Sequence, residues 1–173
     1  MLTFIAVSGS LRAASANSAV LRAAAALAPA GVRVEIYDGV GNLPHFNPDI
    51  EGDPPAAVLA WRAMLRECDA VLIASPEYAH GVAGAFKNAL DWVVGSAELA
   101  GKDVALINTS ARAEHAQAAL AEIIVTMGWN IVAAPVIPVA NKGLDESAIA
   151  ADPVLAAQLN DVLKSLVQNK RRT

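Results

Sequence analysis

The chain opens with an apolar run, a polar loop and a helical pattern in immediate succession. Residues 2–7 have the length and β-branched content of a buried strand. An alanine-rich stretch follows, on which Val20, Leu21, Ala24 and Leu27 recur at helical spacing. The loop between them carries polar side chains, namely Ser10, Arg12, Ser15, Asn17 and Ser18. This order predicts a strand, a loop and a helix start, as in an α/β sheet.

The composition of this loop indicates an anion site. The first-turn N–H groups of a helix have no acceptor within the helix, and the helix dipole favours negative charge there. Hydroxyl and amide groups can donate hydrogen bonds, and Arg12 can make a two-pronged contact with a phosphate. Ser15 or Asn17 could alternatively serve only as the helix cap, but capping accounts for one polar residue of the five. The loop therefore predicts a phosphate site.

Two common nucleotide-binding patterns are absent from this loop. It lacks the Gly-Lys-Ser/Thr ending of a P-loop, which argues against a magnesium-bound nucleotide. It also lacks the G-x-G-x-x-G pattern, which argues against a dinucleotide held in the Rossmann manner. A monoester phosphate is the ligand that the loop predicts.

Length, composition and charge narrow the class of protein. A chain of 173 residues predicts a single domain over residues 1–173. It has no apolar run of membrane-spanning length and no basic leader, so we expect a soluble, cytoplasmic protein. The single cysteine, Cys68, precludes an intrachain disulfide and is expected to be a buried structural thiol. A net charge of −4 argues against binding to nucleic acid or to a membrane surface.

Four further apolar runs, at residues 32–37, 70–74, 104–108 and 131–136, alternate with helical patterns. The last helix is marked by Leu155, Leu159, Leu163 and Leu166. Alternation of this kind predicts an α/β fold with helices on both faces of a doubly wound, five-stranded parallel sheet. The expected strand order is 2-1-3-4-5, as in flavodoxin-like folds, which makes strands one and three neighbours.

Polar loops also follow the third and fourth predicted strands, at residues 75–84 and 109–112. In doubly wound sheets, ligands bind beyond the carboxyl ends of the strands, where the strand order reverses. The first and second polar loops are therefore expected to meet at one site. The three histidines lie on separate segments without ligand spacing, so no metal site is expected.

Several motifs together resemble the NAD(P)H-dependent FMN reductase family, a flavodoxin-like group that includes quinone, azo-dye and chromate reductases. The combination of Pro-Glu-Tyr with Lys-Asn-x-x-Asp-Trp is the most specific of them. The matching blocks are Gly9-Ser10-Leu11-Arg12 with Ser15 and Asn17, Leu43-Pro44 with Phe46-Asn47-Pro48-Asp49, Pro76-Glu77-Tyr78, Gly84, and Lys87-Asn88-Ala89 with Asp91-Trp92.

The resemblance implies FMN as the cofactor. It assigns the FMN phosphate to Ser10, Arg12, Ser15, Asn17 and Ser18, and the isoalloxazine ring to Pro76, Glu77, Tyr78, Ala79, His80 and Gly81. Ser110 and Arg112, in the third loop, are further candidates. The chain departs from the family where Ala79 and His80 follow the Pro-Glu-Tyr motif, and where the third loop lacks glycines.

The resemblance also implies a reaction. NAD(P)H, as co-substrate, and a loosely specified small acceptor would react in turn at one face of the flavin, in two-electron, ping-pong fashion. No catalytic side chain is required, because the cofactor carries the chemistry. A flavodoxin-like electron carrier for a protein partner is the alternative. A flavin-dependent regulatory protein is a third possibility, which no residue favours.

The resemblance implies a homodimer or homotetramer as well. It places Lys87 and Asp91 at a subunit contact, although the pair can equally lie on a solvated helix face. The long connection over residues 38–55 is expected to supply further contact surface.

Overall fold

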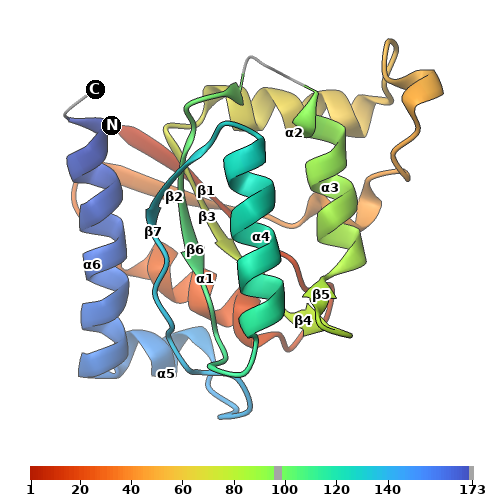
Figure 1. Cartoon of the computed structure of the whole chain (residues 1–173). Helices are drawn as coiled ribbons and strands as arrows, with labels where there is room; N and C mark the ends of the chain where they lie inside the picture. Colours follow the sequence, from red (N-terminus) through yellow and green to blue (C-terminus); the bar gives the residue numbers. More distant parts are fainter. Residues whose placement is uncertain (96–98, 172–173) are drawn as a thin grey trace.

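The computed structural model describes residues 1–95 and 99–171, and its centre is a five-stranded parallel sheet (Figure 1). The strand order is β2-β1-β3-β6-β7. The strands are β1 (Leu2–Ser8), β2 (Val32–Tyr37), β3 (Ala70–Ala74), β6 (Asp103–Ile107) and β7 (Asn130–Ala133). Counting only these strands, the order is the predicted 2-1-3-4-5. The predicted α/β fold is confirmed.

The helices cover both faces of the sheet. They are α1 (Ala16–Ala26), α2 (Ala56–Glu67), α3 (Gly84–Val94), α4 (Glu114–Thr126), α5 (Glu146–Ala151) and α6 (Pro153–Lys170). One core contains side chains of α2, α3 and α4, and the other contains side chains of α1, α5 and α6. Alternate residues of each strand face opposite cores, as Ile5 and Phe4 do on β1. All residues of β3 and β6 are buried, because both faces of these central strands are covered.

Some boundaries differ from the sequence-based expectations. Residues 104–108 were expected as the fourth strand, but β6 begins one residue earlier. The fifth strand was expected to reach residue 136, yet β7 ends at Ala133. Pro135, which has no N–H, interrupts the ladder, and only an isolated bridge between Asn108 and Val136 continues it. A short helix, α5, also precedes the predicted last helix, in which Leu155, Leu159, Leu163 and Leu166 are buried as expected.

The connection over residues 38–55 packs on helix α3. It contains two 3-10 turns, η1 (Gly39–Asn42) and η2 (Pro48–Ile50). Between them, the carbonyl oxygen of Pro44 accepts hydrogen bonds from Asn88 Nδ2 at 2.9 Å and from Trp92 Nε1 at 2.7 Å. The backbone N–H of Phe46 donates to Asn88 Oδ1 at 2.7 Å, and the Phe46 ring meets Trp92 edge to face. The middle of this connection is therefore held against α3, and its use as contact surface between subunits stays a prediction.

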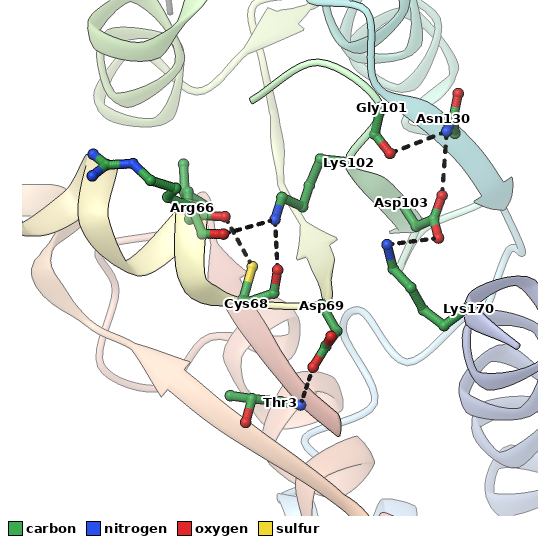
Figure 2. Close-up of polar contacts among 10 residues, drawn as sticks. Thr3, Arg66, Cys68, Asp69, Gly101, Lys102, Asp103, Asn130 and Lys170 are labelled. Atoms are coloured by element: carbon green, nitrogen blue, oxygen red, sulfur yellow. Dashed lines mark hydrogen bonds and ion pairs between the residues drawn. The ribbon is translucent and has the colours of Figure 1, made fainter. Parts of the chain in front are cut away.

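Polar contacts join the segments at the amino end of the sheet (Figure 2). The Lys102 ammonium donates to the carbonyl oxygens of Cys68 and Arg66 at the carboxyl end of α2, where a cation is favoured. The carboxylate of Asp103 is buried, accepts from Asn130 Nδ2 and lies 3.4 Å from Lys170 Nζ of α6. Cys68 is buried, as the sequence predicts, and its burial raises the pKa of the thiol.

In the part of the chain that the structure describes, no helix is both long enough and apolar enough to cross a membrane.

Candidate functional site

A cavity of about 740 Å³ opens at the carboxyl end of the sheet. Its walls come from the loops after β1, β3 and β6, and from the segment between β7 and α5. Most residues predicted for the site line this cavity: Ser10, Arg12, Ser15, Asn17, Pro76, Glu77, Tyr78, Ser110 and Arg112. Ser18, Ala79, His80 and Gly81 are not among the lining residues.

Serine side chains hold the first loop in shape. Ser8 Oγ accepts hydrogen bonds from the backbone N–H of Ser10 and from the hydroxyl of Ser18 at 2.9 Å. Ser15 is the N-cap of α1, and its Oγ accepts from the N–H of Ser18. Capping is thus one role of Ser15, while Ser10 and the exposed Arg12 remain on the cavity wall. The Ser18 hydroxyl does not line the cavity and supports the loop through its hydrogen bond to Ser8.

The first and second loops touch at Gly9. The N–H of Gly9 donates to the carbonyl oxygen of Ala74 at 2.9 Å. A Cβ atom placed on Gly9 would lie 2.3 Å from Ser75 Oγ and 2.8 Å from Ser75 Cβ, well inside van der Waals contact. Only glycine permits this approach. The two loops therefore meet where the strand order reverses, as the sequence predicts.

The second loop contains a small hairpin that sequence analysis missed. Its strands are β4 (Glu77–Tyr78) and β5 (Gly81–Val82). The two residues between them, Ala79 and His80, have φ angles of 50° and 60°, which makes the connection a type I′ turn. The hairpin lies beside the first turn of α4 (Figure 1).

Two contacts tie this hairpin to α4. Glu77 Oε2 accepts a hydrogen bond from the N–H of Ala116 at 2.8 Å, which satisfies one of the free donors of the first turn of α4. The His80 ring stacks on the His115 ring with centroids 4.3 Å apart. The Glu77 carboxylate is therefore engaged in capping, whereas Tyr78 lines the cavity and is 56% exposed.

The third loop is shaped by Asn108, the residue after β6. Asn108 Oδ1 accepts from the N–H of Ser110 at 3.0 Å, and its Nδ2 donates to the carbonyl oxygen of Ala113 at 3.2 Å. Thr109 Oγ1 donates to Asn17 Oδ1 at 3.0 Å, which joins this loop to α1. The loop thus reaches the cavity without the glycines that the family pattern led us to expect.

The segment from Val139 to Glu146 forms a fourth wall that sequence analysis did not single out. It also includes Asn141 and Gly143, which have positive φ angles. Glu146 Oε2 lies 3.2 Å from Arg22 Nε of α1. Its own backbone N–H and Arg22 lower the pKa of the Glu146 carboxyl. The available signal was the mostly polar stretch over residues 141–146, which the apolar residues 137–140 separate from the expected fifth strand.

Two of the three arginines on the cavity wall, Arg12 and Arg112, have no acidic partner among the described residues. The acidic groups are all engaged: Glu77 caps α4, Asp145 caps α5, and Glu146 pairs with Arg22. Neither Arg12 nor Arg112 forms an ion pair within residues 1–95 and 99–171. The cavity therefore suits an anionic ligand. Over the same residues, no cluster of histidine, cysteine or carboxylate side chains could hold a metal ion.

A parallel sheet in this order, with a polar cavity at the reversal of strand order, is the arrangement of flavodoxin-like proteins. Within that class, the chain belongs to the NADPH-dependent FMN reductase family, whose model matches residues 2–145.

Proteins of this family resemble the chain closely. An NAD(P)H-dependent FMN reductase of Pseudomonas aeruginosa is 42% identical over 109 residues, which are 61% of this chain and 58% of that protein. A quinone reductase of Escherichia coli K12 is 37% identical over 113 residues, 63% of this chain and 60% of its own. The chain thus spans less than two thirds of these relatives' length. Among solved structures, the flavoenzyme NAD(P)H:(acceptor) oxidoreductase FerB from Paracoccus denitrificans superposes with a TM-score of 0.81 at 30% identity, covering 99% of this chain and 98% of its own.

Proposed function

We propose that this protein is an NAD(P)H-dependent, FMN-containing oxidoreductase of the flavin or quinone reductase type. The observation that carries the proposal is the meeting of the first two loops at a cavity whose wall carries Arg12, which forms no ion pair within the described residues. The family to which the chain belongs, and the names of its relatives, support an enzyme over an electron carrier. The bound flavin would supply the two-electron chemistry, and the acceptor would be a small molecule such as a quinone.

The residues of the first loop fit a monoester phosphate. The N-terminus of α1, an eleven-residue helix, offers backbone N–H groups and a favourable dipole. Ser10, Arg12 and Ser15, from the same loop, also line the cavity. We assign the phosphate to these three side chains. Asn17 and Ser18 support them, Asn17 through Thr109 and Ser18 through Ser8.

The second loop fits one edge of a flat ring. Pro76, Glu77 and Tyr78 line the cavity, and Gly81 continues the hairpin at its margin. In our proposal, backbone groups of residues 76–81 meet the polar edge of the isoalloxazine, and Tyr78 flanks the ring. Ala79 and His80 would hold the turn at the rim. Ser110 of the third loop would complete the wall.

Substituting Arg12 by alanine is expected to weaken FMN binding while leaving the fold intact. A charge-assisted hydrogen bond contributes about 1.5–3 kcal/mol, which corresponds to a loss of affinity of roughly 10- to 150-fold. Titration of apoprotein with FMN, followed by flavin fluorescence, measures this loss. Arg33→Ala is the matched control, because Arg33 is an arginine of β2 that pairs with Glu35 and does not line the cavity. Equal affinities of the Arg12 variant and the control would contradict the phosphate assignment.

Kinetics test the reaction. Mixed anaerobically with NADPH, the FMN-loaded protein is expected to lose its flavin absorbance within the time of one turnover, whereas an electron carrier would bleach slowly.

Initial rates with NADPH and a benzoquinone varied together are expected to give parallel double-reciprocal lines, since both substrates would use one face of the ring in turn. Intersecting lines would mean that both substrates are bound at once, and would overturn the shared site.

We also propose that the protein acts as a homodimer or homotetramer in the cytoplasm. Exposed apolar side chains on α2, α3 and α4 support self-association: Leu59, Val94 and Val125 are 48–60% exposed. The Lys87–Asp91 ion pair of α3 is a candidate for the subunit contact. The single cysteine, Cys68, is compatible with a reducing compartment such as the cytoplasm. Sedimentation equilibrium tests the assembly. A particle of 17.9 kDa at micromolar concentration would contradict it.

A further inference from the structure

Arg112 lies on the cavity wall, and the proposed phosphate site of FMN does not use it. FMN carries a single monoester phosphate, and the first loop already offers it a helix N-terminus, hydroxyls and Arg12. Arg112 belongs to the third loop, which follows β6. Because β3 separates β1 from β6, the ends of these two strands lie about 10 Å apart. Arg12 and Arg112 are thus carried by loops that follow two different, non-adjacent strands.

The backbone that carries Arg112 is firmly held. Its N–H donates to Ser110 Oγ at 3.3 Å, and the N–H of Ala113 donates to the carbonyl oxygen of Ser110 at 3.0 Å. The Asn108 side chain bridges the start and the end of the same turn. An arginine on a preorganised loop loses little backbone entropy when it binds an anion. The side chain itself is exposed and forms no ion pair in the described part of the chain.

We infer that Arg112 binds a phosphate group of the NAD(P)H co-substrate and thereby sets the affinity for the nucleotide. The inference rests on the proposed function, which brings a second phosphate-bearing molecule to the cavity that already holds FMN. The geometry of a guanidinium suits two oxygens of one phosphate. That phosphate is either the pyrophosphate, which NADH and NADPH share, or the 2′-phosphate, which only NADPH carries.

The test compares Arg112→Ala, Arg112→Lys and the control Arg33→Ala as FMN-loaded proteins. Anaerobic flavin reduction is followed with NADPH, with NADH and with N-benzyl-1,4-dihydronicotinamide, a hydride donor without phosphate. With Arg112→Ala, the NADPH concentration for half-maximal reduction is expected to rise about 10-fold or more. Reduction by the phosphate-free donor is expected to stay unchanged. A matching rise with NADH identifies the pyrophosphate, and no rise with NADH identifies the 2′-phosphate.

Two binding measurements complete the test without turnover. Calorimetric titration of FMN-loaded protein with NADP⁺ is expected to show the same loss for Arg112→Ala, partly restored by Arg112→Lys, which keeps the charge but not the fork. Titration of each apoprotein with FMN is expected to give affinities within twofold of the unsubstituted protein.

Three results would overturn the inference: a large loss of FMN affinity, an equal effect on the phosphate-free donor, or unchanged nucleotide binding. The first would make Arg112 a flavin ligand, the second a structural residue, and the third a solvated side chain. If the unsubstituted protein binds FMN but none of the three donors reduces it, the proposed function itself fails, which is a separate result.

Discussion

Replacing Trp92 with alanine is expected to lower the free energy of unfolding by about 3–5 kcal/mol. The Trp92 side chain is 0% exposed and fills the core between α3 and the connection over residues 38–55. Its indole N–H also donates to the carbonyl oxygen of Pro44, and its ring meets Phe46 at 5.1 Å. The alanine variant loses the buried ring, the hydrogen bond and the aromatic contact together. Urea denaturation followed by circular dichroism measures the change.

Two further variants separate these contributions. Trp92→Phe keeps most of the buried ring but lacks the indole N–H, so we expect it to lose less stability than the alanine variant. Val154→Ala, on the 67% exposed Val154 of α6, is expected to change stability by no more than about 0.5 kcal/mol. A cost below about 1 kcal/mol for Trp92→Ala would show that the Pro44 segment and α3 do not depend on each other.

The Gly9→Ala variant is expected to lose both stability and flavin affinity. The added methyl group would lie 2.3 Å from Ser75 Oγ and 3.1 Å from Ser75 Cα, so either the first loop or the second must move. Overpacking of this kind costs about 1–3 kcal/mol. Because both loops line the cavity, the displacement reaches the phosphate site directly. Thermal unfolding and FMN titration, each compared with the unsubstituted protein, measure the two effects.

A second substitution tests whether contact with the Ser75 side chain causes the losses expected for Gly9→Ala. Adding Ser75→Gly to Gly9→Ala removes the two closest atoms, and partial recovery of FMN affinity is expected. Gly52→Ala is the matched control, since a Cβ on Gly52 would meet no atom within 4 Å. If the double variant is as impaired as Gly9→Ala alone, contact with the Ser75 side chain is not the reason for glycine at position 9.

The central part of the fold could be predicted because buried parallel strands are apolar throughout. β3 is entirely buried and its predicted bounds are the observed ones. The β4–β5 hairpin could not be predicted, since each strand has two residues and its turn, Ala79–His80, lacks the glycine and asparagine typical of type I′ turns. The apolar run continues to residue 136, but β7 ends at Ala133, because Pro135 has no N–H to donate to the ladder.

The candidate site was predictable where a polar loop directly follows a strand. Ser10, Arg12 and Ser15 reach the cavity because the carboxyl ends of parallel strands share one edge of the sheet. The wall formed by Val139–Glu146 was missed because it has no regular period and comes to the cavity only through the course of the chain after β7. Arg22 was missed for a related reason: its partner, Glu146, is more than a hundred residues away.

The attachment of the β4–β5 hairpin to α4 limits how the cavity could select an acceptor in the proposed reaction. The Glu77–Ala116 hydrogen bond and the stack of His80 on His115 hold the hairpin at its base and at its tip. To swing over a bound molecule, this segment would have to break both contacts or move together with α4, a thirteen-residue helix packed in the core. The width of the opening next to Tyr78 is therefore expected to be constant. An opening of constant width would admit acceptors that are thin and flat, and selection would not involve closure of the protein around them.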